Sequence, residues 1–145
     1  MKRFRFNLEK ILKLREENEK AWEIKLGRIV SRCNSVVREM KSIDRSRREH
    51  FSRFRLSSGG LEGLQAAELY FRKMESDKKR LEAELEKLNE ERAEVQKEYM
   101  KASNDRKVIE KLKERKSGEY YKAQLLAEIK EIDDMNTQAA ARKGI

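Results

Sequence analysis

Apolar residues recur at every third or fourth position over most of the chain and form two long stripes. The first stripe contains Leu8, Leu12, Trp22, Leu26, Ile29, Cys33, Val36, Met40, Ile43 and Phe54. The second contains Leu64, Ala67, Phe71, Met74, Leu81, Leu85, Leu88, Val95, Tyr99, Ala102 and Ile109. This spacing places apolar side chains along one side of a helix, as in the seam of a coiled coil. The pattern predicts two long amphipathic helices.

Consecutive helix breakers separate the two stripes at Ser57-Ser58-Gly59-Gly60. Glycine is about 1 kcal/mol less favourable than alanine inside a helix, so this run indicates a turn over residues 57–61. We expect helices at about residues 5–56 and 62–140, folded back so that paired residue numbers add up to about 118. The fold class is then all-α, a single antiparallel two-helix coiled-coil hairpin over residues 1–145. A parallel homodimer in which the break is only a kink is the alternative.

The second helix is longer than the first and extends beyond it. Its apolar spacing slips after Ile109, and Ser117-Gly118 is a weak point in helical propensity. Beyond that point the helix has an apolar stripe without an expected partner, which we call the overhang: Tyr120, Tyr121, Leu125, Leu126, Ile129 and Ile132. Unpaired apolar stripes usually mark interaction surfaces. Residues 137–145 are expected to fray.

Composition agrees with long helices, because the chain has no proline, 43% charged residues and 37% hydrophobic ones. The net charge of +9 is uneven. Residues 1–58 contain 17 basic and 8 acidic residues, whereas residues 59–145 contain 19 of each. A basic first helix favours an acidic partner surface, nucleic acid or anionic lipid. Five arginines near its end (Arg45, Arg47, Arg48, Arg53, Arg55) surround Phe51 and Phe54, forming either a solvated basic face or a docking patch.

The residues needed for catalysis or metal binding are scarce. Cys33 is the only cysteine and His50 the only histidine, which argues against disulfides, cysteine-based zinc sites and histidine-centred triads. No phosphate-binding loop of the form Gly-x-x-x-x-Gly-Lys-Ser/Thr occurs. We therefore expect no catalytic residue, cofactor, metal or small-molecule substrate. The sequence has no bilayer-spanning apolar run and no signal-peptide core, so we expect a cytoplasmic protein.

Both ends of the sequence resemble the FliJ family, the coiled-coil proteins of the flagellar type III export apparatus. The segment from Phe4 to Arg15, FRFNLEKILKLR, is similar to that family's opening F-x-F-x-L-x-x-[VIL]-L-x-x-R. The segment from Lys130 to Met135, KEIDDM, with the basic tail at 139–143, resembles its closing element. The length and the Ser/Gly turn are also similar, so the resemblance covers the whole chain.

This resemblance implies a stalk similar to the central stalk of rotary ATPases. It implies binding to the hexameric flagellar export ATPase, whose assembly and activity the stalk promotes, and to the export gate protein and substrate chaperones. Membrane association would be peripheral and through these partners, at the inner face of the cell membrane beneath the flagellar basal body. The ATPase-binding candidates are Phe4, Phe6, Leu8, Leu12 and Arg15, with Arg28 added from the basic helix. The gate-binding candidates are Tyr70, Met74 and Leu81.

Other functions remain open at this point. A stalk of a virulence type III secretion system would have the same architecture. A basic coiled coil can also bind nucleic acid through phosphate contacts, although here the basic residues are spread along a helix among many acidic ones. We therefore expect no nucleic-acid partner. A purely structural coiled coil is the remaining alternative.

Overall fold

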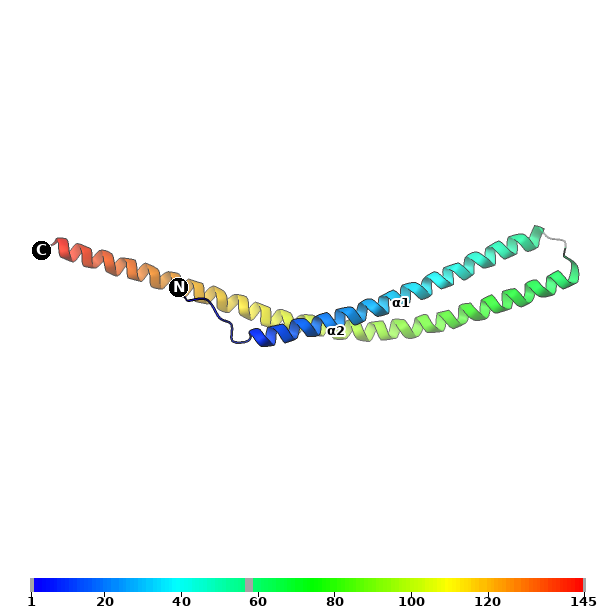
Figure 1. Ribbon diagram of the computed structural model, residues 1–145, viewed down its shortest axis with the longest axis horizontal. Coiled ribbons are helices and arrows are strands. Elements are labelled where there is room, and N and C mark those ends of the chain that lie inside the picture. The colour runs from blue at the N-terminus through cyan, green and yellow to red at the C-terminus, as the bar shows by residue number, and fades with distance from the viewer. Residues whose placement is uncertain (1, 57–58, 145) are drawn as a thin grey trace. The chain divides into compact units, whose positions relative to one another are not determined.

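Two helices make up nearly all of the computed structural model, which describes residues 2–56 and 59–144. Helix α1 covers Glu9–Leu56 (48 residues) and helix α2 covers Gly60–Lys143 (84 residues) (Figure 1). The all-α helical hairpin predicted from the sequence is confirmed. The chain divides into two compact units, the terminal unit (Met1–Glu19 with Lys101–Ile145) and the hairpin unit (Lys20–Met100).

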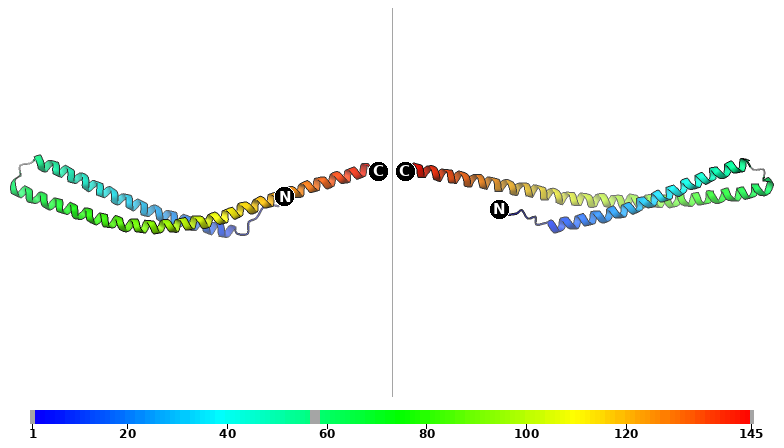
Figure 2. Two further views of the ribbon diagram at one scale, coloured as in Figure 1. Left: turned by 180° about the vertical axis from the view of Figure 1, so that it is seen from behind. Right: turned by 45° about the horizontal axis from the view of Figure 1, so that its top comes forward.

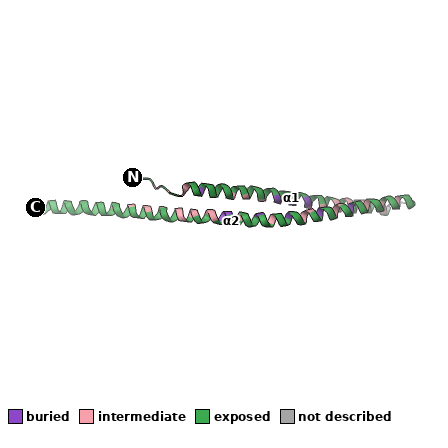
Figure 3. Ribbon diagram, turned by 90° about the horizontal axis from the view of Figure 1, so that it is seen from below, coloured by how far each residue is buried: buried purple, intermediate pink, exposed green. Residues whose placement is uncertain are grey.

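In the hairpin unit, α1 and α2 lie side by side and antiparallel (Figures 1 and 2). Their shared core consists of Ile29, Cys33, Val36, Leu81, Leu88 and Val95, with Trp22, Leu26, Met40, Ile43 and Leu85 packed against it. Every one of these residues belongs to a stripe predicted from the spacing. Figure 3 shows the buried positions along the facing sides of the two helices. Burial of a large apolar side chain contributes about 1.5–3 kcal/mol, so this seam is the main source of stability in the unit.

Contacts across the hairpin unit join residues whose numbers add up to values on both sides of the predicted sum of about 118. The sum is 116 for Arg32–Glu84 at 3.7 Å, 120 for the rings of His50 and Tyr70, and 122 for Asp44–Lys78 at 3.1 Å. Near the turn, Leu61 and Leu64 are 72% and 51% exposed. The packing on α2 therefore begins only further along the helix, where Ala67 and Phe71 are half-buried.

The start of α2 depends on a glycine. Gly60 has a φ of 65°, a left-handed conformation that costs other residues about 1–2 kcal/mol. The preceding carbonyl, that of Gly59, accepts the first helical hydrogen bond, from the backbone N–H of Gly63 at 3.3 Å. The predicted turn at 57–61 includes Ser57 and Ser58, which lie outside the described residues. Its last two residues, Gly60 and Leu61, already belong to α2.

In the terminal unit, residues 2–8 precede α1 without forming a helix or strand, and we call them the N-terminal arm. A turn at Asn7-Leu8 leads into α1. Helix α1 starts at Glu9, later than the predicted start at about residue 5, with the Leu8 carbonyl accepting the N–H of Leu12 at 2.8 Å. Helix α2 is continuous through Ser117-Gly118 and ends at Lys143, beyond the predicted end at about residue 140 and inside the segment expected to fray. Leu12, Ala102 and Ser103 are buried in this unit.

We expect the substitution Gly60→Ala to destabilise the hairpin unit by about 1 kcal/mol, because alanine disfavours the left-handed conformation. Gly63→Ala is the matched control. Gly63 lies inside α2 with free space around the position of an added Cβ, so alanine there should stabilise by up to about 1 kcal/mol. Urea unfolding, followed by the fluorescence of Trp22, which packs against the core, measures the stability of both variants. If the urea midpoints of the two variants shift equally and in the same direction, the role assigned to Gly60 is wrong.

Candidate partner-binding surfaces

The N-terminal arm packs on α2 through alternate residues. Phe4, Phe6 and Leu8 are half-buried, whereas the residues between them are exposed, as expected for an extended segment with one face covered. The ring centroids of Phe4 and Tyr120 are 5.6 Å apart. The Tyr120 hydroxyl donates a hydrogen bond of 2.6 Å to the carbonyl oxygen of Lys2. The outer face of the arm presents Lys2, Arg3 and Arg5 to solvent.

Ion pairs join the first turns of α1 to α2 in the terminal unit. They are Glu9–Lys113 at 2.8 Å, Arg15–Asp105 at 3.5 Å and Glu19–Arg106, with Arg106 also bound to Glu110. We call this set the ionic ladder. Exposed ion pairs contribute about 0–1 kcal/mol each, and salt screens them. The large apolar side chain that is buried here is Leu12, at 4% exposure. The terminal unit therefore combines a short apolar contact at Leu12 with several ion pairs between α1 and α2.

Glu19 and Arg106 are the most enclosed members of the ladder. Their side chains are 15% and 23% exposed. The hydrogen bond to Glu19 raises the pKa of Arg106 above its ordinary value; desolvation opposes this shift, and the carboxylates of Glu110 and Glu16 add to it. Because the pKa is raised, the stabilisation from this charge is fully present at neutral pH and is lost only in strong alkali.

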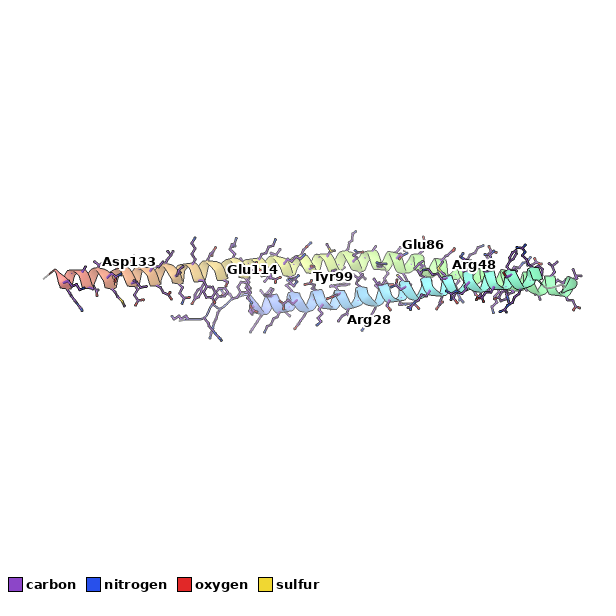
Figure 4. All side chains as sticks on the ribbon, turned by 90° about the horizontal axis from the view of Figure 1, so that it is seen from above. Arg28, Arg48, Glu86, Tyr99, Glu114 and Asp133 are labelled. Carbon is purple, nitrogen blue, oxygen red and sulfur yellow. The ribbon has the colours of Figure 1, made fainter. Side chains whose placement is uncertain are left out.

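The structure brings together five of the six ATPase-binding candidates. Phe4, Phe6, Leu8, Leu12 and Arg15 all lie in the terminal unit. Leu12 is buried, so a partner cannot contact it while the helices are packed. Arg15 is exposed and also paired with Asp105. Arg28 is exposed on α1 in the hairpin unit (Figure 4).

Most of the overhang is exposed, as Figure 3 shows for the last part of α2. The exposed fractions are 57% for Tyr121, 57% for Leu125, 47% for Ile129 and 57% for Ile132. Leu126 is 59% exposed, and Met135, which the predicted stripe does not include, extends the same apolar surface at 59% exposure. Tyr120 differs from the expectation. It is half-buried because the arm covers it.

The gate-binding candidates have different environments in the hairpin unit. Met74 and Leu81 are 8% and 3% exposed and lie between the helices. Tyr70 is half-buried, with its ring centroid 3.7 Å from that of His50. Only Tyr70 of these three offers its side chain to a partner while the hairpin is closed.

Tyr70 lies next to a surface hollow near the start of α2, which we call the aromatic–basic hollow. It has a volume of about 550 Å³ and is lined by Arg47, Arg48, Phe51, Ser52 and Phe71. A second hollow of about 390 Å³, lined by Tyr70, His50, Arg53 and Phe54 among others, shares Phe71 with it. Phe51 is 54% exposed, and its ring centroid is 6.5 Å from that of Phe71. The arginine cluster around Phe51 was visible in the sequence, but Phe51 lies off the seam stripe.

In the described part of the chain, no group of three or more His, Cys, Asp and Glu side chains is arranged to hold a metal ion. Over the same residues, neither helix has an apolar stretch sufficient to cross a membrane.

Comparison with known proteins gives one family. The sequence matches the family of the flagellar FliJ protein over residues 4–144, which include most of the arm and both helices. No curated protein and no solved structure matches the chain.

We expect Asp105→Lys to loosen the terminal unit, because it places a positive charge against Arg15. Backbone amides of residues 9–19 should then exchange hydrogen about twofold faster, in line with roughly 0.5 kcal/mol for an exposed pair. The double variant Asp105→Lys with Arg15→Glu restores an attractive pair and should restore protection. Amides of residues 29–40 in the hairpin unit are the internal control. Exchange in the double variant as fast as in the single variant would show that the ladder does not hold the unit.

Proposed function

Since the chain belongs to the FliJ family, we propose that it is a non-enzymatic central-stalk component of the flagellar type III export apparatus. A general stalk role in flagellar export follows from membership of the family. The finer proposal is that the protein binds the hexameric export ATPase, promotes its assembly and activity, and couples it to the export gate and to substrate chaperones. The observation that supports it most is a family match over residues 4–144 of a chain that folds as a helical hairpin.

The ATPase-binding surface that we propose lies in the terminal unit. Phe4, Phe6 and Leu8 supply apolar contacts, and Arg15 supplies charge. Leu12 supports this surface from inside, since it is buried against α2. The basic excess of residues 1–58, including exposed Arg28, suits an acidic ring lumen, because long-range attraction raises the rate of encounter.

The overhang is the second part of this surface. Tyr121, Leu125, Ile129 and Ile132 form an exposed apolar stripe, and such stripes are usually covered by a partner. We propose that the lumen of the ATPase ring covers it. Binding there would bury the stripe and order the end of α2.

For the export gate, we propose the aromatic–basic hollow and the adjoining Tyr70 as the contact surface. Exposed Phe51 and the flanking Arg47 and Arg48 combine apolar area with positive charge. Met74 and Leu81 act beneath this surface by holding the helices together. Binding of substrate chaperones, a cytoplasmic location and attachment beneath the basal body through partners are proposed from the family resemblance alone.

The purified protein should raise both the turnover rate and the hexamer fraction of the cognate flagellar export ATPase. The stimulation should decline as salt rises from low to physiological concentration, because salt screens a basic stalk in an acidic ring. Stimulation of a virulence-type ATPase to the same extent would favour the virulence alternative. No stimulation, together with salt-sensitive retention on DNA, would favour nucleic-acid binding instead.

We expect the double charge reversal Arg15→Glu with Arg28→Glu to raise the concentration needed for half-maximal stimulation about tenfold, through slower encounter. Arg72→Glu with Arg80→Glu is the matched control, since it makes the same change in net charge at exposed arginines outside the proposed surface. Circular dichroism should show that both variants keep their helices. An equal loss in both pairs would mean that total charge matters and that Arg15 and Arg28 have no specific role.

A further inference from the structure

The N-terminal arm contains candidate ATPase-binding residues that are already occupied within the molecule. Phe4 and Phe6 are half-buried, and the ring of Phe4 packs at a tilt of 48° against that of Tyr120 in the overhang. We propose that the arm is a reversible strap, closed on Tyr120 in the free protein and displaced when the export ATPase binds. This inference rests on the proposed function and adds to it the regulation of the ATPase-binding surface.

The arm is held by a short contact. It forms no helix, and its aromatic and hydrogen-bonding contacts with α2 among the described residues are the Phe4–Tyr120 ring pair and the hydrogen bond from the Tyr120 hydroxyl to the Lys2 carbonyl. Phe6 and Leu8 are half-buried in addition. Ordering the arm costs backbone and side-chain conformational entropy at every one of its residues. We infer that the free energy gained from these contacts is similar in size to the entropic cost of ordering the arm. The closed and open arms are then close in free energy, which allows a partner to shift the equilibrium between them.

The two faces of the arm have different roles in binding the partner: the basic face attracts it, and the apolar face makes the close contact. In the closed state the outer face presents Lys2, Arg3 and Arg5, so attraction to an acidic partner does not require opening. The apolar face, with Phe4 and Phe6, becomes available only when the arm leaves α2. Opening also uncovers Tyr120, which adjoins exposed Tyr121 at 5.5 Å between ring centroids. Release of the arm therefore enlarges the apolar surface on both sides of the contact.

The contacts that follow the arm limit how far α1 can separate from α2. The next contact after the arm is the ion pair between Glu9 and Lys113, which is partly exposed and replaceable by water. Leu12 follows at 4% exposure, and separating it from α2 would expose a buried apolar side chain. The arm and the first turn of α1 can thus open while Leu12 keeps the rest of the terminal unit closed.

Spin labels on the intact chain test the strap directly. Cysteines replacing exposed Arg5 and Lys116, in a Cys33→Ala background, report the distance between the arm and α2. The free protein should show a short, narrow distance population. Tyr120→Phe, which removes only the hydroxyl, should shift part of this population to a broad distribution of longer distances. Tyr120→Ala should shift a larger part. Leu126→Ala, at an exposed residue away from the strap, is the control and should change nothing. A distribution that neither Tyr120 substitution alters would overturn the proposal.

The export ATPase supplies the second half of the test. Adding it should convert the narrow population to the broad one. Tyr120→Phe should lower the concentration for half-maximal stimulation about two- to threefold, because less of the protein starts in the closed state. If the ATPase is stimulated while the labels stay close, the stalk function stands and the strap is wrong. If the wild-type protein does not stimulate the ATPase, the proposed function fails, and displacement by the ATPase fails with it.

Discussion

A protein of two helices has no interior beyond the line along which the helices touch. Each helix has one partner, so only residues on the facing sides can be buried, and the seam has to supply nearly all of the apolar stabilisation. In the hairpin unit this seam is continuous from Ile29 to Val36 on α1 and from Leu81 to Val95 on α2. All other surfaces are exposed by geometry. Partner binding therefore has to use side chains off the seam, such as Phe51 or Ile129, or to compete with packing that is already present.

The seam was predictable because a helix repeats its environment every 3.6 residues, and this periodicity is visible in the sequence alone. The place where packing begins on α2 was not predictable, because Leu64 belongs to the stripe but is 51% exposed. The conformation of the N-terminal arm was only partly predictable. Phe4, Phe6 and Leu8 alternate as in an extended segment, yet the charged residues around them also fit the beginning of a helix.

The candidate sites show why a family motif does not separate binding from packing. Leu12, Met74 and Leu81 occupy motif or stripe positions, and all three are buried. Tyr120 was expected to be unpaired, because the expectation counted helical partners only and a non-helical arm covers it. Phe51 was recognisable as part of a basic cluster, but its exposed position next to Phe71 is evident only in the structure. The sequence thus indicated which segments are candidates for partner binding. The three-dimensional packing determines which of their side chains remain accessible to a partner.

Salt acts on each unit in two opposing ways. Sulfate and similar salts strengthen apolar burial, which holds the core of the hairpin unit and Leu12 of the terminal unit. The same ions screen the pairs Glu9–Lys113 and Arg15–Asp105 in the terminal unit and Lys78–Asp44 in the hairpin unit. A single denaturation midpoint for the whole chain averages these contributions. Such a midpoint can stay constant across a salt series even while each unit changes substantially, so thermodynamic work on this protein needs one probe in each unit.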